Sequence, residues 1–404
     1  MTREEIYQRC EREIDRTKGV LLEAGTGSGK SKVAVDLCKH IGEHYTEPMQ
    51  VLILVAKRVH KQTWANELHK WHPSGNPVMV VQTECYESLK KCVGYSYDVV
   101  ILDECHHVQS ELRQELLNHV SFRYMIGLSA TIPKKLKYHL MTTYNLGLVQ
   151  CSLQDAIEDG ILPEPEIMLL PLQLQNYAKS ETIEINPKKP GEIYYDEYER
   201  LWAHKKNHHA ILRCTPKQKL QYMNNRIIFA KRAFDATRNE GAKRRWLRMC
   251  GDRLKFLAEC KNSLVKELLG NMSDKRVLTF CTSIEQTEEL GSNCIHSKNK
   301  NADDILKKFN DGKLNHITAC QVLNEGVNLK NCQFGVFANI NASGIIKVQR
   351  VGRILRHEHP VVIIPYYVGS REEEIVKEWI GEYNEKLIHK YNTLKDLTDA
   401  IINR

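Results

Sequence analysis

The segment VVILDECHHVQS, residues 99–110, places two carboxylates, a thiol and two imidazoles in succession after four apolar residues. Such side chains serve three kinds of chemistry: metal coordination, general acid/base catalysis, and the positioning of magnesium and water in a nucleotide hydrolase. All three stay open for the five residues concerned, which are Asp103, Glu104, Cys105, His106 and His107. The choice between them depends on the rest of the chain.

A glycine-rich turn near the N-terminus favours nucleotide hydrolysis. AGTGSGKS, residues 24–31, follows the apolar run GVLLEA and matches the phosphate loop G-x-x-x-x-G-K-[ST], with Ala24 in place of the first glycine. Glycines can take positive φ and expose backbone N–H groups, which bind phosphate together with a helix N-terminus. An ordinary strand, turn and helix is the alternative. The residues expected to contact nucleotide are Gly25, Thr26, Gly27, Ser28, Gly29, Lys30 and Ser31.

This turn gives the acidic residues a role. Lys30 would reach the β- and γ-phosphates, and the Ser31 hydroxyl would ligate Mg²⁺. Phosphate-loop enzymes carry a metal-binding aspartate at the end of a second strand, and VVILD supplies Asp103. Glu104 follows at the edge of the sheet where ligands bind, and we expect it to orient and deprotonate the attacking water.

Composition restricts the class of protein. A chain of 404 residues exceeds the roughly 250 to 300 that one core supports, so two domains are expected. The net charge of +8 permits a polyanionic partner, and the longest apolar runs are only strand-sized, which predicts no leader peptide or membrane span. Thirteen cysteines without a C-x-x-C pair argue against a disulfide framework or a zinc ribbon. We expect reduced, mostly buried thiols and a cytoplasmic protein.

Apolar runs alternate with amphipathic segments over residues 20–150 and again over 277–368. This alternation predicts two parallel sheets flanked by helices, an α/β fold. The run MLLPLQL is expected to be a strand of the second sheet, and EYERLWAHKKNHHAILR to be helical. The segment REEEIVKEWIGEYNEKLIHKYNTLKDL has helical spacing and predicts terminal helices.

The chain resembles the DExH-type helicases and translocases of superfamily 2, in particular phage-type recombination and branch-migration helicases and the motor part of restriction enzymes. Residues 103–106 resemble the DExH box, and three further elements follow in the family's order. Ser129-Ala130-Thr131 resembles the element that couples hydrolysis to strand movement. QVLNEGVN, residues 321–328, resembles the glycine-containing element of the second domain, and QRVGRILR, residues 349–356, matches Q-R-x-G-R-x-x-R.

This resemblance implies two RecA-like domains with ATP between them. The division it suggests is 1–165 for the ATP-binding domain, 166–191 for a linker and the first strand of the second, 192–270 for a basic helical insertion, 271–370 for the second domain, and 371–404 for C-terminal helices. Arg353 and Arg356 would be arginine fingers on the γ-phosphate, beside Gln349; a solvated basic helix face is the alternative.

The resemblance also implies roles in nucleotide reading and coupling. Tyr7 and Gln8 would read adenine, although the fuller motif of DEAD-box RNA helicases is missing. Gly326 and Asn328 would border the nucleotide, with Asn328 where many members carry aspartate. His106 is expected to bond toward residues 129–131 or the second domain. Cys105 is expected to pack, and no role is predicted for His107.

Two sets of residues are predicted to contact nucleic acid. By resemblance, the first set lies in the two domains: Lys57, Arg58, Thr83, Thr282, Ser283 and His296. The second set lies in the insertion, where residues 226–261 hold eleven Lys/Arg against four Asp/Glu. The residues of this set are Lys243, Arg244, Arg245 and Trp246. Phe234, Trp246 and Phe256 could stack on bases or form the helix-packing face. His204 and His208 have metal-ligand spacing on a helix, but a solvated basic helix is the competing interpretation.

The predicted function is an ATP- and Mg²⁺-dependent DNA helicase or translocase. It would act as a monomer on single-stranded, forked or branched DNA in recombination or repair, without a membrane, in the host cytoplasm if phage-encoded. Three alternatives remain open: an RNA helicase, a duplex DNA translocase that separates no strands, and an ATP-switched nucleic-acid-binding module.

Overall fold

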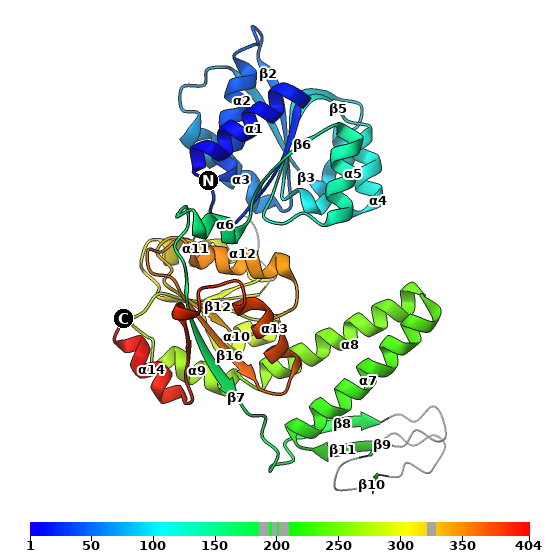
Figure 1. Cartoon of the computed structure of the whole chain (residues 1–404), viewed down its shortest axis with the longest axis vertical. Helices are drawn as coiled ribbons and strands as arrows, with labels where there is room; N and C mark the ends of the chain where they lie inside the picture. Colours follow the sequence, from blue (N-terminus) through cyan, green and yellow to red (C-terminus); the bar gives the residue numbers. More distant parts are fainter. Residues whose placement is uncertain (186–193, 196–199, 202–209, 321–328) are drawn as a thin grey trace.

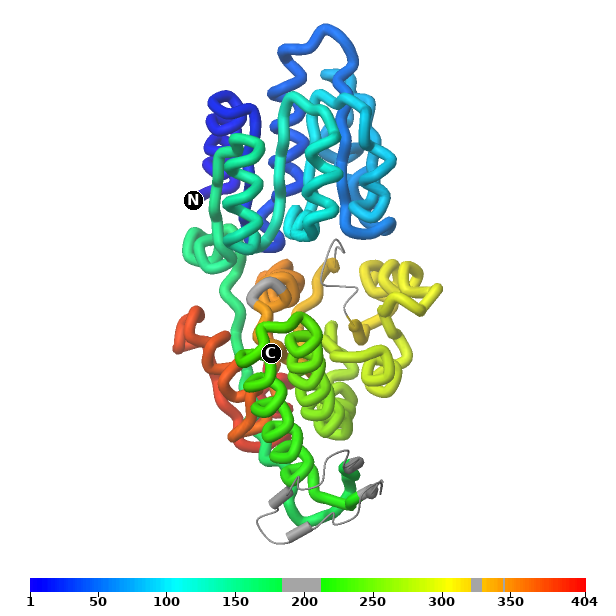
Figure 2. The backbone as a smooth tube through the Cα atoms, turned by 90° about the vertical axis from the view of Figure 1, so that its right-hand side faces the viewer, coloured from blue at the N-terminus to red at the C-terminus, as the bar shows by residue number. Residues whose placement is uncertain are grey.

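The computed structural model describes residues 1–185, 194–195, 200–201, 210–320 and 329–404. Two parallel sheets, each flanked by helices, lie one above the other in Figure 1, with a helical hairpin extending from the second. Figure 2 shows the same two bodies from the side. The predicted α/β class and the two-sheet arrangement are therefore confirmed.

The first sheet has six parallel strands in the order β3-β2-β4-β5-β1-β6. Its strands are mostly buried, because runs of apolar side chains are covered by helices on both faces. The strands are β1 (Gly19–Ala24), β2 (Met49–Val55), β3 (Met79–Cys85), β4 (Ser96–Asp103), β5 (Ser121–Ser129) and β6 (Gly147–Cys151). The helices are α1 (Arg3–Thr17), α2 (Lys30–Gly42), α3 (Arg58–Trp71), α4 (Glu111–Asn118), α5 (Lys134–Tyr144) and α6 (Leu153–Glu158), with the 3₁₀ helices η1 (Tyr86–Cys92) and η2 (Cys105–Gln109).

The register of this sheet brings its functional segments to one edge. β5 lies between β1 and β4, with Glu23 opposite Ser129 and Asp103 opposite Leu128. The carboxyl ends of parallel strands share one edge of a sheet. The glycine-rich turn, Asp103 and Ser129 therefore meet there.

The second sheet has seven parallel strands in the order β13-β14-β12-β15-β16-β7-β17. They are β7 (Glu166–Leu172), β12 (Val277–Phe280), β13 (Cys294–Ile295), β14 (His316–Ala319), β15 (Phe334–Phe337), β16 (Val361–Tyr367) and β17 (Ile388–Lys390). The helices are α9 (Asn262–Gly270), α10 (Ile284–Leu290), α11 (Ala302–Asn310), α12 (Gly344–Ile354), α13 (Arg371–Ile380) and α14 (Leu394–Ile402), with the 3₁₀ helix η4 (Glu385–Leu387). The segment MLLPLQL is a strand of this sheet, as predicted.

The hairpin consists of α7 (Pro216–Thr237) and α8 (Glu240–Glu259). α7 begins with a capping box between Thr215 and Gln218, with proline at its first position. It ends at Arg238, whose φ of 49° is left-handed, and Asn239 then caps α8 by accepting from Gly241 N at 2.6 Å. The two caps explain why the chain reverses there.

Two helical predictions are wrong in part. Ala210–Cys214, at the end of EYERLWAHKKNHHAILR and its following cysteine, is strand β11, which pairs antiparallel with β8 (Glu181–Ile185). A shorter pair, β9 (Tyr194–Tyr195) and β10 (Arg200–Leu201), lies in the same region. In the C-terminal segment, Ile388–Lys390 is the edge strand β17 instead of helix, because it pairs with β7. Both errors arise from pairing across the chain, which overrides local helical periodicity.

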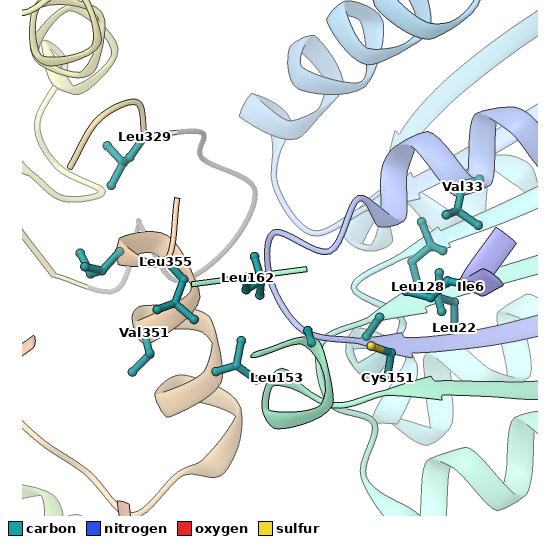
Figure 3. Packing of buried hydrophobic residues seen from close by; sticks show 14 of the residues in the cluster. Ile6, Leu22, Val33, Leu128, Cys151, Leu153, Leu162, Leu329, Val351 and Leu355 are labelled. Atoms are coloured by element: carbon teal, nitrogen blue, oxygen red, sulfur yellow. The ribbon is translucent and has the colours of Figure 1, made fainter. Parts of the chain in front are cut away.

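One hydrophobic core extends from the first sheet into the second. Figure 3 shows Leu153 and Leu162 beside Val351 and Leu355, between the two sheets. Eleven of the thirteen cysteines are buried, as expected. Among the described residues no helix is both long and apolar enough to cross a bilayer.

Candidate nucleotide site and nucleic-acid interface

The turn after β1 has the backbone that its glycines predict. Gly27 and Gly29 both have a φ of 95°, in the left-handed region that favours glycine. α2 starts at Lys30, so the first N–H groups of the helix border the turn. The Lys30 ammonium folds back and donates to the carbonyl oxygens of Ala24 at 2.8 Å and Gly25 at 3.3 Å. The segment therefore has an anion-binding geometry.

Three buried polar atoms at this edge fit a nucleotide. Oγ1 of Thr26, Oγ of Ser28 and Nε2 of Gln349 are buried and have no hydrogen-bond partner among the described residues. Buried polar groups are normally satisfied, so unsatisfied ones in one cleft indicate a polar ligand. The triphosphate of ATP has the acceptors that two hydroxyls and an amide can use. The residues present thus fit ATP.

Asp103 is oriented by two aromatic residues. Its Oδ2 accepts from the Trp64 indole at 2.8 Å, and its carbonyl oxygen accepts from the Tyr86 hydroxyl at 2.9 Å. Trp64 lies on α3 and is 2% exposed, and Tyr86 begins η1. Sequence reasoning missed both residues, because neither is adjacent to Asp103 in the chain. Fixing the carboxylate in this way suits a metal ligand of the kind predicted for Asp103 with Ser31.

Glu104 and His106 both contact Ser129. Oγ of Ser129 lies 3.3 Å from Glu104 Oε2 and 3.0 Å from His106 Nδ1. It also donates to the Thr131 carbonyl at 2.9 Å. Glu104 has a φ of 50°, rare outside glycine and frequent at functional sites. The expected contact between His106 and residues 129–131 is therefore present, while their coupling role remains a prediction.

The other residues of DECHH pack. Cys105 is fully buried, as expected, and burial raises the pKa of its thiol. The ring of His107 lies 5.8 Å from that of Tyr86 and 4.6 Å from that of His106. His107 thus supports the two residues that hold Asp103 and Ser129. Ala130 is 6% exposed beside them.

One face of α12 carries two of the predicted catalytic residues of the second domain, and the third, Arg356, follows the helix. Gln349, Gly352 and Arg353 are spaced i, i+3 and i+4, which places them on one side of α12. Gln349 and Arg353 are 2% and 4% exposed. Gly352 marks where this face meets the first domain: a Cβ added to it would lie 2.6 Å from Thr26 Cβ. α12 therefore packs directly on the glycine-rich turn.

Charges from both domains act on Lys30. Burial lowers the pKa of its ammonium; the carboxylates of Glu104 and Asp103 oppose that shift, and the guanidinium groups of Arg353 and Arg356 add to it. Burial likewise lowers the pKa of Arg356. These four charged groups come from both domains and act on the one ammonium of Lys30. A solvated basic helix face, the alternative interpretation of QRVGRILR, therefore does not describe Arg353 and Arg356.

The other predicted nucleotide contacts are those of Tyr7, Gln8, Gly326 and Asn328. The Tyr7 hydroxyl donates to Glu11 at 2.7 Å and the Gln8 amide to Glu4 at 3.5 Å, both within α1. Their reading of adenine stays a prediction. Gly326 and Asn328 lie outside the described residues, as do His204 and His208.

Most of the nucleic-acid residues predicted in the two domains follow strands. Lys57 and Arg58 follow β2, Thr282 and Ser283 follow β12, and Thr83 lies within β3. Ser283 also caps α10 by accepting from Gln286 N at 3.1 Å. His296 is 6% exposed, and its Nε2 lies 3.4 Å from Glu288. The contact of His296 with nucleic acid stays a prediction.

The aromatic residues of the hairpin pack within the protein. The rings of Trp246 and Phe234 stack at 5.8 Å with 14° between their planes. Phe256 is buried beside Leu220, Leu257 and Tyr367. The helix-packing interpretation therefore describes Phe256, whereas Trp246 is partly exposed and its contact with nucleic acid stays a prediction.

The hairpin exposes other residues instead. The side chains of Phe229, Leu247 and Ile228 are exposed, with Phe229 at 64%. Phe229 lies three residues from both Arg226 and Arg232, a spacing that places all three along one stripe of α7. Arg244 and Arg245 are exposed, and Lys243 pairs with Glu240 at 3.2 Å. The three-residue spacing of Phe229 from Arg226 and Arg232 is the signal in the sequence that could have identified Phe229 as a candidate nucleic-acid contact.

Two family models match the chain. Residues 260–358 match the helicase conserved C-terminal domain, and residues 78–134 match the type III restriction enzyme, res subunit. The protein of Invertebrate iridescent virus 3 that carries the name helicase 109L is 28% identical over 149 residues. That match covers 32% of this chain and 44% of the viral protein, less than half of its length.

Solved structures share the fold. S. cerevisiae Dbp5, solved with RNA and ADP BeF3, superposes with a TM-score of 0.60 at 10% identity, covering 99% of this chain and 93% of its own. The type ISP restriction-modification enzyme LlaBIII, solved with DNA, gives a TM-score of 0.56 at 13% identity. This comparison covers 97% of the present chain and 31% of LlaBIII.

Proposed function

We propose that the chain is an ATP-hydrolysing nucleic-acid motor of superfamily 2, of the restriction-enzyme motor type; the matches to the helicase C-terminal domain and to the type III restriction enzyme, res subunit, support this. One observation carries the proposal: the glycine-rich turn of the first domain lies against Gly352 of α12 in the second, next to Arg353. A site assembled from two domains can convert nucleotide state into motion between them.

Each residue of the cleft has a proposed task. The glycine-rich turn and Lys30 bind the phosphates, and Ser31 and Asp103 would hold Mg²⁺, which neutralises charge on the β- and γ-phosphates when bound. Glu104 orients the attacking water and accepts its proton. Arg353 and Arg356 stabilise the charge that develops on the γ-phosphate, a contribution worth about 10³ to 10⁵ in rate for arginine fingers. Gln349 contacts the phosphates beside them.

Coupling is assigned to Ser129. Its hydroxyl is hydrogen-bonded to both Glu104 and His106. A movement of the Glu104 carboxylate would therefore shift the segment Ser129–Thr131. Closure of the cleft on ATP and opening after hydrolysis would then alternate the grip of the two domains on one strand. Tyr7 and Gln8 are proposed to select adenine, with Gly326 and Asn328 near the nucleotide.

Nucleic acid is proposed to run along the strand ends and the hairpin. Lys57, Arg58, Thr83, Thr282 and Ser283 would hold the sugar-phosphate backbone. On the hairpin, Lys243, Arg244 and Arg245 would bind phosphate, and the partly exposed Trp246 and the exposed Phe229 would offer surfaces on which bases can stack. Such contacts are independent of base sequence and sensitive to salt.

Forked or branched DNA is the proposed substrate, with a monomer acting on it in recombination or repair in the cytoplasm. Support comes from the match to a restriction-enzyme family and from a basic hairpin of two helices, 22 and 20 residues long. A panel of DNA and RNA forks with 3′ or 5′ tails tests it through ATPase and strand-displacement rates. DNA forks should stimulate both. Stimulation by RNA alone would assign an RNA helicase, ATPase without displacement a duplex translocase, and tight binding without turnover an ATP-switched binding module.

A further inference from the structure

The back of α12 is attached to α13 by a buried lysine. Lys347 lies on α12, is 5% exposed, and donates to the Trp379 carbonyl at 3.1 Å and the Glu382 carboxylate at 2.6 Å. Trp379 is in the last turn of α13, where carbonyl groups lack helical partners and a cation is favourable. Lys347 precedes Gln349 by two residues, so it points away from the face that meets the phosphate turn. Lys347 therefore attaches α12 to α13 on the side opposite the phosphate turn.

Hydrophobic packing also holds α12 against α13. Val351 of α12, Trp379 of α13 and Tyr383 after it belong to one buried core. Apolar contacts are non-directional, whereas the hydrogen bonds of Lys347 have a preferred direction. These bonds therefore contribute to the rotation of α12, and with it to the direction of Gln349 and Arg353.

The other end of α13 is attached to the base of the hairpin by a second buried lysine. Lys261 follows α8, and its ammonium lies 2.6 Å from Glu372 Oε1 and 3.2 Å from the Pro365 carbonyl. Both side chains of this ion pair are fully buried. Glu372 is in the first turn of α13, and its Oε2 accepts from Tyr367 N at 3.1 Å. Such a pair is weak evidence for added stability, but its geometry is specific.

Further bonds hold the hairpin base to the second domain. The Tyr367 hydroxyl donates to the Cys260 carbonyl at 3.0 Å. On the other side, the Gln286 amide donates to the Ala258 carbonyl at 3.1 Å and accepts from Thr282 N at 2.8 Å. The hairpin base is thus bonded both to α13 and to the loop that is proposed to hold nucleic acid.

We propose that Lys347 is a positioning residue for the arginine-bearing face of α12, and that α13 joins it to the base of the α7–α8 hairpin. Through this connection, nucleic acid bound to the hairpin changes the orientation of α12 and so the rate of ATP hydrolysis. The inference rests on the proposed ATPase function and adds to it a route of control that uses no residue of the cleft.

The first test concerns Lys347 alone. Lys347→Met keeps the volume of the side chain and removes its charge; we expect kcat to fall about tenfold, because small misplacement of catalytic groups is costly, while KM for ATP changes less than about twofold. Lys347→Arg should recover at least about a third of the lost rate. The control Lys308→Met removes an exposed lysine of α11 paired with Asp304 and should leave kcat unchanged.

The second test concerns the connection. The double variant Lys261→Met, Glu372→Gln removes the ion pair without leaving a buried charge unpaired, so it should fold. We expect its ATPase rate without nucleic acid to stay within about twofold of wild type and the stimulation by forked DNA to drop by about threefold or more. Tyr367→Phe is a milder change that removes only the bond to Cys260, and it should also reduce the stimulation by forked DNA. It tests the same connection if the double variant does not fold.

The outcomes separate the two proposals. If the wild-type protein hydrolyses no ATP with any nucleic acid, the proposed function fails and this inference fails with it. If wild type is active and Lys347→Met matches it in kcat, or lowers kcat and KM together without rescue by arginine, Lys347 is not a positioning residue. Unchanged stimulation in Tyr367→Phe and the double variant would overturn the role of α13.

Discussion

The backbone of Gly352 on α12 lies directly against Thr26 in the glycine-rich turn. A Cβ on Gly352 would come 2.6 Å from Thr26 Cβ and 3.1 Å from the Thr26 carbonyl oxygen, closer than packed atoms tolerate. The glycine in QRVGRILR is therefore a steric requirement for the close approach of α12 to the glycine-rich turn. It joins the two most recognisable segments of the chain at one contact.

Gly352→Ala should separate the two domains at this contact. The added methyl must push α12 away from the turn, at a cost of about 1 to 3 kcal/mol for overpacking, and kcat for ATP should fall at least about tenfold. Steady-state ATPase measures the effect. Gly251→Ala is the matched control, since Gly251 lies in α8 with nothing within 4 Å of an added Cβ and should gain stability by about 1 kcal/mol. Equal kcat for Gly352→Ala and wild type would contradict the contact.

Glu104→Gln should abolish turnover while nucleotide binding persists. The amide keeps the size of the side chain but cannot accept the proton of the attacking water, and loss of a general base costs about 10² to 10⁴ in rate. Nucleic-acid-stimulated ATPase and fluorescent-nucleotide binding give the two readouts. Glu115→Gln changes an exposed carboxylate of α4 and serves as control. Normal turnover in Glu104→Gln would remove this residue from the site.

Trp64→Phe should lower the affinity for magnesium and leave the fold unchanged. The variant loses the indole N–H that bonds to Asp103 at 2.8 Å, and loss of such a supporting bond typically costs about 10- to 100-fold in metal affinity. A titration of ATPase against Mg²⁺ should show a higher half-saturating concentration. Trp71→Phe provides the comparison, because Trp71 is on the same helix and bonds to Glu67 instead. Parallel titrations for both variants would exclude a special role for Trp64.

Nucleotide affinity should fall with rising pH because of Lys30. Burial holds the pKa of Lys30 below its ordinary 10.5, so the ammonium loses its proton at lower pH than a surface lysine. Bound phosphates favour the charged ammonium and raise the pKa of Lys30, so nucleotide binding takes up protons when the pH is above the pKa of Lys30 in the free protein. Nucleotide affinity is full below that pKa and falls as the pH rises above it. Calorimetry in buffers of different ionisation enthalpy measures the uptake. Lys30→Arg, always charged, should show none, and the same uptake in that variant would assign the effect elsewhere.

Arg244→Ala with Arg245→Ala should reduce binding to forked DNA and its dependence on salt. Removing one phosphate contact lowers the slope of log affinity against log salt by about one. Both residues are exposed and lie near the start of α8. Lys386→Ala with Lys395→Ala removes two exposed charges from the C-terminal region and controls for net charge. If the two double variants give the same slope, the hairpin does not contact phosphate.

The hairpin shows where sequence reasoning reached its limit. Its helices follow from caps and periodicity, which are local properties, and the positive charge follows from composition. Which aromatic side chains face inward depends on how two helices are rotated against each other and against β16. That rotation buries Phe256, stacks Trp246 on Phe234, and leaves Phe229 exposed.

By itself the sequence determined most strands and helices of the two sheets, the glycine-rich turn and the order of the recognisable segments, because these depend on hydrogen bonding and side-chain periodicity within a few residues. Only the tertiary structure decided the pairing of β11 with β8 and of β17 with β7, the approach of Gly352 to Thr26, the Trp64 bond to Asp103, and the buried lysines at the two ends of α13. Each of these joins residues far apart in the chain. Their geometry is fixed by packing of the whole molecule, which no local pattern records.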